Sequence, residues 1–397
     1  MLLYLILALL SGILAGTITG LTPGIHINLI ASFVIASTFL TNLPPTILLI
    51  FIISMAITHT FLDFIPSIYL GAPDEDTGLS ILPGHQLLMK GKGHEAVILT
   101  LQGSVIAVAS LILIIPLFIF IIPIVYPFIN QMMAFFLIWI SLFLLFHEKE
   151  SRLLATLIFI LAGFLGIATL NISIEQPLLP LLTGLFGSST IIYSIKSKTI
   201  IPQQIIEKIK IQKSDLIKPA IATTIISPIC ALFPGLGSSQ AAIIGAEVTR
   251  NLKQEQFLAL LGSVNTLIMS TSFFILYILE KSRTGAANSI SQLITLEPSH
   301  LKIIILTIFA ATIISTLLTI KISKIFAKNI SKINYTKISI VILSLLIIII
   351  LKFSGFLGLL IFTVSTFLGL TCIELGVRRG LLMGSLLIPT ILFYLPF

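Results

Sequence analysis

The sequence predicts an all-α polytopic membrane protein made of two inverted-topology repeats. Each repeat is expected to contain a re-entrant Pro-Gly hairpin and about five transmembrane helices. Three observations predict this class: the composition, the length of the apolar runs and a pair of broken runs. Of the 397 residues, 57% are hydrophobic and 10% are charged, whereas soluble proteins carry about 25% charged residues. This composition excludes a soluble domain, a disordered chain and a nucleic-acid-binding protein.

The apolar runs account for most of the chain. A helix that spans a bilayer needs about 20 apolar residues, and lipid admits only helices and closed barrels. The runs lack the alternation of barrel strands, so each is expected to be helical. In the first half they lie near 3–20, 25–41, 45–70, 96–125, 131–147, 152–171 and 177–195. In the second half they lie near 219–233, 236–250, 255–279, 301–322, 336–352, 355–372 and 379–396.

The first two runs of each half are joined by a Pro-Gly break, in LTPGIHIN and in LFPGLGSSQ. Broken backbone is tolerated in a membrane only where it is buried in protein or lines a cavity. We therefore expect re-entrant hairpins over 3–41 and 219–250, followed by spans over 45–195 and 255–396. The first repeat then covers 1–195, a cytoplasmic basic linker 196–218, and the second repeat 219–397.

The basic residues test this topology. With the linker inside and the hairpins not crossing, 19 of the 23 Lys and Arg residues lie in inside loops. The four outside are Lys281, Arg283, Lys302 and Lys352. This split follows the positive-inside rule, so the net charge of +8 is interpreted as a topology signal. It places the protein in the cytoplasmic (cell) membrane as a multi-pass protein.

Each half then holds an odd number of crossings, so the halves have opposite orientations. Pro23-Gly24 and Pro234-Gly235 match at an offset of 211 residues. A weaker echo relates Asp76-Thr77-Gly78 to Arg283-Thr284-Gly285. Inverted repeats with paired Gly/Pro-broken segments are typical of secondary transporters, whose substrate site lies at the repeat interface.

The two Pro-Gly tips are the first candidate site. A helix that restarts after a break presents free N–H groups and the positive end of its dipole, which suits an anion. The residues expected to bind the substrate are Thr22, Pro23, Gly24, His26, Asn28, Pro234, Gly235, Gly237, Ser238, Ser239 and Gln240. The alternative is that the tips are packing breaks between helices.

Three titratable residues lie near or within the expected spans. His26 is a candidate to bind the anion, to titrate during transport or to stay neutral as a hydrogen-bonding group. His59 and Asp63 are four residues apart and share a helix face. An intramembrane carboxylate marks function by default, so both are candidates for a coupling ion, Na⁺ or H⁺. The alternative is that Asp63 caps the break before Pro66 or pairs with His59.

Other polar groups have weaker signals. Asp74, Glu75 and Asp76 either attract a cation or belong to a solvated loop. Glu374 is expected to pair with Arg378 and Arg379 at a helix end. A patch in the span after the second hairpin either joins helices or lines a cavity; it contains Asn265, Thr266, Ser270, Thr271 and Ser272.

Enzyme signatures are absent from the sequence. It contains no HExxH, nucleophile elbow, Walker loop or paired-cysteine site, and Cys230 and Cys372 lie in apolar runs. We expect no cofactor, no metal site and no catalytic residue. An intramembrane hydrolase that uses Asp63 and His59 is retained as an alternative.

Three segments carry a family resemblance: GILAGTITGLTPGIH, GAPDEDTGLSILPGHQLLMKGKGHEAV and ALFPGLGSSQAAIIGAEV. They resemble the large permease subunit (TctA-type) of tripartite tricarboxylate transporters, most closely an archaeal stand-alone branch. The resemblance implies ion-driven carboxylate uptake with an extracytoplasmic binding protein and a small membrane subunit. The chain is shorter than expected of the bacterial permeases, and LTPGIHIN replaces a more Gly-rich tip.

The function expected from the sequence is therefore ion-coupled secondary transport of a small organic anion. The Pro-Gly pair is also similar to that of membrane proteins that recycle polyisoprenyl phosphate lipids, so a lipid-phosphate transporter is the main alternative. The expected partners are the anion or lipid phosphate, membrane lipids, the two transporter subunits and a second copy of the chain. Nucleic acid is not among them.

Overall fold

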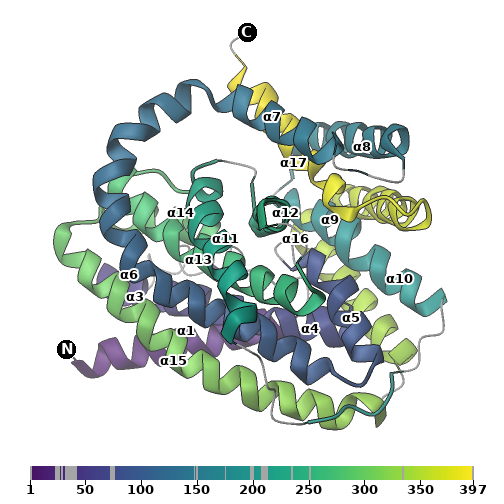
Figure 1. The fold of residues 1–397 in the computed structure, drawn as a ribbon, viewed down its shortest axis with the longest axis horizontal. Coiled ribbons are helices and arrows are strands. Elements are labelled where there is room, and N and C mark those ends of the chain that lie inside the picture. Colours follow the sequence, from purple (N-terminus) through teal and green to yellow (C-terminus); the bar gives the residue numbers. More distant parts are fainter. Residues whose placement is uncertain are drawn as a thin grey trace.

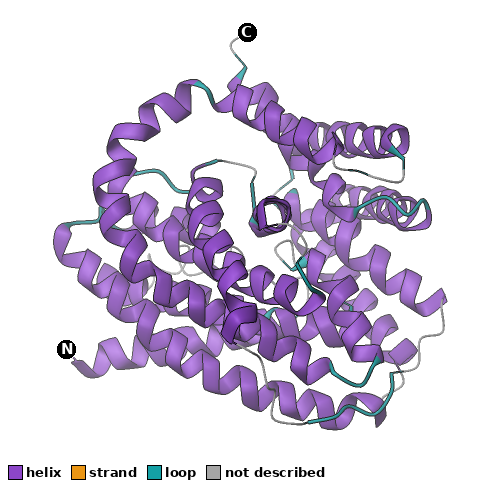
Figure 2. Ribbon diagram, in the orientation of Figure 1, coloured by secondary structure: helices purple, strands orange, loops and turns teal. Residues whose placement is uncertain are grey.

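A computed structural model gives the fold. The residues that it describes are 2–22, 27, 30–31, 43–71, 77–146, 148, 151–174, 176–196, 201–206, 213–233, 236–249, 252–332 and 335–395. Within them every regular element is a helix and no strand occurs (Figure 2). Eight of the helices are long and apolar enough to cross a membrane. The expectation of an all-helical, polytopic membrane protein is confirmed.

The described helices follow the apolar runs to within several residues, whereas the run 25–41 lies almost entirely outside the described residues (Figure 1). The first half holds α1 (Leu2–Leu21), α3 (Pro45–Leu62), α4 (Phe64–Leu70), η1 (Gly78–Ser80), α5 (Ile81–Met89), α6 (Gly93–Gln131), α7 (Met133–Phe146), α8 (Arg152–Asn171), α9 (Leu178–Leu182), the π-helical turn η2 (Thr183–Ser188) and α10 (Ser189–Lys196). The second half holds α11 (Lys213–Leu232), α12 (Ser238–Thr249), α13 (Gln254–Leu279), α14 (Gly285–Leu293), α15 (Pro298–Asn329), η3 (Ile330–Lys332), α16 (Tyr335–Glu374), η4 (Arg379–Met383) and α17 (Gly384–Tyr394).

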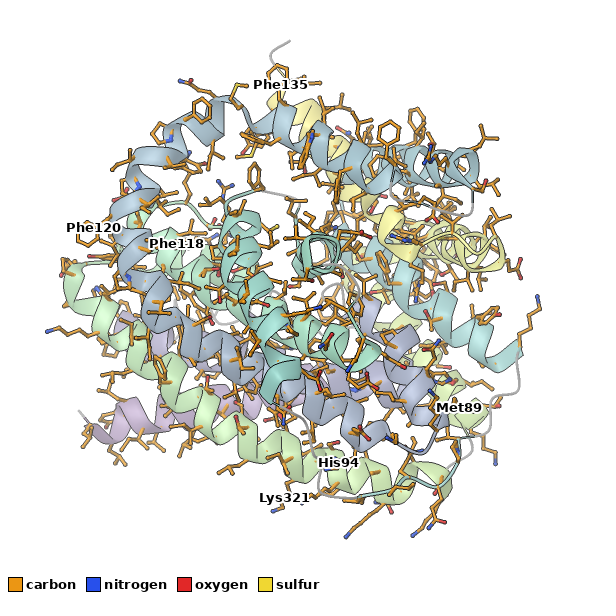
Figure 3. All side chains as sticks on the ribbon, in the orientation of Figure 1. Met89, His94, Phe118, Phe120, Phe135 and Lys321 are labelled. Carbon is orange, nitrogen blue, oxygen red and sulfur yellow. The ribbon has the colours of Figure 1, made fainter. Side chains whose placement is uncertain are left out.

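Two long helical segments lie at the centre of the bundle. The segment Pro45–Leu70, which is α3 continued by α4, is 89% buried, and α13 is 100% buried. The other long apolar helices are between 22% and 44% buried, and apolar side chains such as Phe120 and Phe135 point away from the body of the molecule (Figure 3). The outer helices therefore present an apolar surface suited to lipid, while α3 and α13 form the core.

The central helices exchange partners between the two halves. α3 packs on α1 of its own half and on α15 of the other half. α13 packs on α11 of its own half and on α6 of the other half. Each core helix thus packs on the first helix of its own half and on a long helix of the other half.

The contact between α6 and α13, here called the glycine crossing, depends on Gly103 and Gly262. A Cβ added to Gly262 would lie 2.0 Å from the carbonyl oxygen of Thr100, and one added to Gly103 would lie 1.9 Å from that of Ala259. The Ser104 hydroxyl also donates to the Gly262 carbonyl at 3.0 Å. Because the backbones are in direct contact, no side chain larger than hydrogen fits there.

The contact between α3 and α15, here called the hydroxyl crossing, is built from side chains. The Ser315 hydroxyl lies 2.9 Å from the Thr58 hydroxyl. The Thr319 hydroxyl donates to the carbonyl of Phe61 at 3.3 Å. These buried hydroxyls join the helices by hydrogen bonds, as is common in membrane bundles.

Polar contacts join α6 to the second half of the chain near both of its ends. Near its C-terminal end, the Tyr126 hydroxyl accepts hydrogen bonds from Arg283 and Lys281. At its N-terminal end, His94 contacts the Ser323 hydroxyl of α15 at 2.9 Å.

The runs 336–352 and 355–372 form two helices under the single label α16, and they meet at a kink at Gly355, whose φ of 64° and ψ of −163° are accessible essentially to glycine alone. One local detail differs from expectation. Glu374 pairs with Lys196 at 3.0 Å and not with the arginines that follow it, so that sequence prediction is wrong. Neighbours in sequence favoured the arginines, but the fold brings α10 alongside α16.

Candidate functional site

The two predicted Pro-Gly tips are described to different extents. Pro23, Gly24, His26 and Asn28 lie outside the described residues, as do Pro234, Gly235 and the acidic run 74–76. Thr22 follows the end of α1, and its amide donates to the carbonyl of Ile18 at 3.0 Å. At the second tip, α11 ends at Leu232 and α12 begins at Ser238.

A cavity of about 350 Å³ lies beside the second tip. Its polar lining comes from four elements: the start of α12, the middle of α13, the start of α14 and, through Thr390, α17. The lining residues are Leu170, Leu178, Ala231, Phe233, Leu236, Gly237, Ser238, Asn265, Ile268, Met269, Ser272, Arg283, Thr284, Gly285, Leu386 and Thr390. The cavity thus brings two helix N-termini and one guanidinium to a common space.

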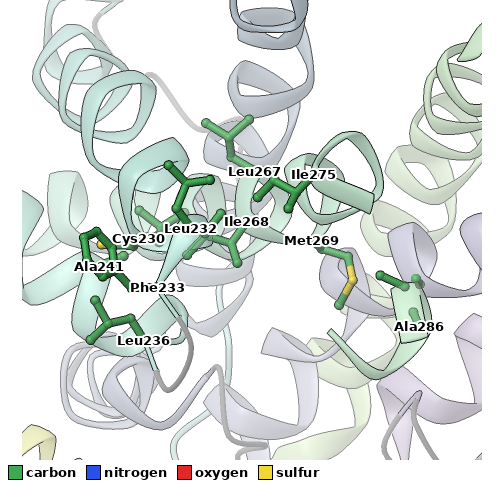
Figure 4. Close-up of a cluster of buried hydrophobic side chains, with 14 of the residues drawn as sticks. Cys230, Leu232, Phe233, Leu236, Ala241, Leu267, Ile268, Met269, Ile275 and Ala286 are labelled. Atoms are coloured by element: carbon green, nitrogen blue, oxygen red, sulfur yellow. The ribbon is translucent and has the colours of Figure 1, made fainter. Parts of the chain in front are cut away.

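The apolar wall of the cavity is part of the core. Figure 4 shows Phe233 and Leu236 from the second tip on one side of Ile268, with Met269 of α13 on the other side near Ala286. Phe233, Leu236, Ile268 and Met269 also line the cavity. Apolar walls with a few convergent polar groups are typical of small-molecule sites.

The start of α12 is ordered by its own side chains. Gln240 accepts a hydrogen bond from the amide of Gly237 at 2.8 Å through Oε1, which is half of a capping box. The Ser238 hydroxyl donates to Oδ1 of Asn265 at 3.3 Å. Ser239 is buried and does not line the cavity. Of the described tip residues in the prediction, Gly237 and Ser238 line the cavity, while Gln240 shapes the helix end.

The start of α14 places a cation at the cavity. Thr284 caps this helix by accepting from the amide of Ala287 at 3.2 Å, and its hydroxyl also lies 3.0 Å from that of Ser272. Arg283, one residue before the cap, donates to the Tyr126 hydroxyl at 2.7 Å. No carboxylate among the described residues pairs with the Arg283 guanidinium. Its positive charge is therefore available to an anion in the cavity.

His59 and Asp63 lie in the core beside this site. His59 Nδ1 is 3.0 Å from the Thr19 hydroxyl of α1. Asp63, at the junction of α3 and α4, accepts a hydrogen bond from Nδ2 of Asn265 at 2.7 Å. The Thr266 hydroxyl donates to that of Thr60 at 3.2 Å. The polar patch on α13 therefore both joins helices and lines the cavity, because Asn265 does each of these.

Arg283 and Thr284 are the site residues that the sequence prediction missed. The sequence analysis counted Arg283 only as one of four outside charges. The echo of Arg283-Thr284-Gly285 with the first half was a signal, because a repeated motif next to a central span marks a matching position. Nothing in the sequence alone indicated that it folds against the second tip.

Fold and cavity together define a multi-pass helical membrane protein with a partly open cavity of mixed polar and apolar lining, a class that includes transporters. The family comparison specifies the class further. The chain belongs to the Tripartite tricarboxylate transporter TctA family, whose family model matches residues 6–384. It is therefore a component of a membrane transporter family, and the predicted resemblance is confirmed.

A relative in Methanocaldococcus jannaschii is also similar. That uncharacterized protein is 30% identical, and the match covers 99% of each chain. No solved structure matches the chain.

Proposed function

We propose that this chain is an ion-coupled permease that moves a small organic anion, a carboxylate, and binds it in the cavity between α12, α13 and α14. One observation carries the proposal: two helix N-termini and the Arg283 guanidinium converge on one cavity. Helix N-termini attract anions through their free N–H groups and the helix dipole. A guanidinium binds carboxylates in a planar, bidentate geometry.

The dimensions of the site fit this class of ligand. The cavity volume of about 350 Å³ is at the lower end of the range for small-molecule sites. Ser238, Asn265 and Ser272 add neutral polar groups to its wall. The family description names tricarboxylate transport, which is consistent with a site built for several carboxylate oxygens.

The inverted repeat and the re-entrant hairpins belong to this proposal. The exchanged packing of α3 on α15 and of α13 on α6 supports two halves related by a pseudo-two-fold axis. α12 has 12 residues, a length of about 18 Å, whereas the hydrocarbon core is about 30 Å thick. Such a helix enters the membrane without crossing it, which supports a hairpin over 219–250.

Three further predictions from the sequence belong to this proposal: the role of the first tip, the site of the coupling ion and the partner subunits. We propose that the first tip, at Pro23-Gly24 with His26 and Asn28, completes the anion site from the other repeat. We also propose that Asp63, with His59, takes the coupling Na⁺ or H⁺. The tripartite family supports a small membrane subunit and an extracytoplasmic binding protein as partners.

Thermal unfolding of the purified protein tests the anion site. A ligand that binds only the folded state adds about 2.7 kcal/mol at a hundred times its dissociation constant. We expect di- and tricarboxylates to raise the unfolding midpoint, and Arg283→Gln to weaken their binding about tenfold or more because a charged hydrogen-bond donor is lost.

The matched control is Lys302→Gln, which removes an exposed charge from the same predicted side of the membrane. Its carboxylate affinity should equal that of the wild type. If carboxylate affinity fell equally in both variants, the cause would be the overall positive charge of the protein and not a specific contact with Arg283. Unchanged carboxylate binding in Arg283→Gln would refute the proposed site. Stabilisation by polyisoprenyl phosphate alone would favour the lipid transporter.

A further inference from the structure

A continuous hydrogen-bonded chain links the buried carboxylate of the core to the cavity. Asp63 Oδ2 accepts from Nδ2 of Asn265 at 2.7 Å. Oδ1 of the same amide accepts from the Ser238 hydroxyl at 3.3 Å. Asp63, Asn265 and Ser238 are each at most 2% exposed, and the last two line the cavity. The chain runs from α3 of one half to α12 of the other.

Asn265 provides the amide in this series of three hydrogen-bonded side chains, and the two ends of its amide group differ. Its nitrogen donates and its oxygen accepts. In the structure the nitrogen faces the carboxylate and the oxygen faces Ser238 and the cavity. This orientation is the one that a charged Asp63 requires, because an ionised carboxylate only accepts hydrogen bonds.

We propose that a monovalent cation bound at Asp63, a proton or a sodium ion, reverses the Asn265 amide and thereby turns its N–H₂ group toward the cavity. The inference rests on the proposed anion site and adds to it the means by which the ion is coupled. A carbonyl oxygen at the cavity repels an anion, whereas an N–H₂ group donates to it. Cation binding in the core therefore raises anion affinity in the cavity.

Both cations impose the same reversal. A proton that adds to Asp63 Oδ2, the oxygen bonded to Asn265, gives an O–H that donates toward the amide, and the Asn265 oxygen is then the group that accepts. A sodium ion takes oxygen ligands, as hard cations do, and likewise attracts Oδ1. In each case Nδ2 is left on the cavity side, where it donates to Ser238 or to the anion.

Asp63 lies at the junction of α3 and α4, and the described elements that pack on these two helices include α1, α5, α6, α13, α14 and α15. Three of them, α1, α13 and α15, bring polar side chains to this part of α3: Thr19, Asn265, Thr266, Ser315 and Thr319. Among the described residues near Asp63, His59 on its own helix is the group that titrates. A test must therefore separate His59 from Asp63.

The first experiment measures the dissociation constant of a carboxylate that stabilises the wild type, with varied pH at fixed sodium and with sodium replaced by potassium at fixed pH. Coupled sites typically change affinity by 5- to 150-fold. We expect affinity to rise about tenfold with the coupling cation. The pH series identifies a proton and the sodium series a sodium ion.

Asp63→Asn is the decisive variant because its neutral side chain imitates the cation-bound state. We expect it to bind the anion as tightly as the cation-saturated wild type, with no remaining dependence on pH or sodium. A simple loss of structure would instead lower affinity under all conditions. Persistence of the dependence in Asp63→Asn, with its loss in His59→Gln, would overturn the proposal.

Asn265→Leu removes the reversible amide at similar volume, and Ser238→Ala removes only the last link. We expect Asn265→Leu to bind the anion with one weak affinity that does not depend on the cation. For Ser238→Ala, we expect the logarithm of the cation-dependent change in anion affinity to fall below half of its wild-type value.

A full cation-dependent change in affinity in Asn265→Leu would overturn this inference while leaving the proposed anion site intact. If Asn265→Leu fails to fold, Ser238→Ala and Asp63→Asn decide the question. Failure of the wild type to bind any carboxylate would refute the proposed function itself.

Discussion

The glycine crossing and the hydroxyl crossing hold the two core helices in different ways. At the glycine crossing, the backbones of α6 and α13 touch at Gly103 and Gly262. At the hydroxyl crossing, Ser315 and Thr319 bridge α15 to α3 through hydrogen bonds. The first contact depends on shape and admits one geometry. The second depends on hydrogen bonds between side chains, which leave more room for substitution.

Among variants at the two crossings, Gly262→Ala should cause the largest loss of stability. The new methyl group would lie 2.0 Å from the Thr100 carbonyl oxygen, so the helices must separate. We expect a loss of about 3 kcal/mol or more, because a backbone clash cannot relax by a rotamer change. The thermal unfolding midpoint in detergent and the monodisperse fraction on size exclusion measure this loss.

Gly245→Ala is the matched control for the same substitution. Its methyl group would lie 3.4 Å from the nearest atom, a methyl carbon of Leu260, which is a tolerated contact. We expect a change of less than about 1 kcal/mol, since alanine is also the better helix former. Equal losses in both variants would show that the glycine crossing is not special.

The double variant Ser315→Ala/Thr319→Val should have an intermediate effect. It removes both hydrogen bonds of the hydroxyl crossing and leaves the helix separation nearly unchanged. Interhelical hydrogen bonds in membranes contribute about 0.6 kcal/mol each, so we expect a loss of about 1 kcal/mol in thermal unfolding. A loss as large as that of Gly262→Ala would contradict the distinction between the crossings.

Ser104→Ala should have the smallest effect. Its hydroxyl supports the glycine crossing through the Gly262 carbonyl, but the close approach of the backbones remains in the variant. We expect a loss of about 0.5 kcal/mol, measured as above. If this variant were as damaging as Gly262→Ala, the hydrogen bond and not the close packing would hold α6 to α13.

The sequence predicted the helices well because the apolar runs carry their own signal. Pro-Gly breaks, loop charges and run lengths located α11, α12 and α13 to within a few residues. The partners of charged side chains were not predictable in the same way. Lys196 and Glu374 are 178 residues apart, and the sequence analysis assigned Glu374 to nearby arginines because it had no measure of distance in space.

The residues that line the candidate cavity could be anticipated from the sequence only in part. Gly237 and Ser238 could be identified from the broken helix, and Asp63 from the rarity of carboxylates in membrane spans. That Arg283 lies at the same cavity as Ser238 depends on how α13 and the loop after it fold back. Such packing between distant segments has no local signature in a single sequence.

The link between Asp63 and Asn265 also sets an order of events during biosynthesis. The two residues are separated by 202 positions. At about 5–20 residues per second, about 10–40 s pass between the synthesis of α3 and that of its α13 partner. Over that interval the nascent first half holds a carboxylate in its central helix without the Asn265 amide that later binds it.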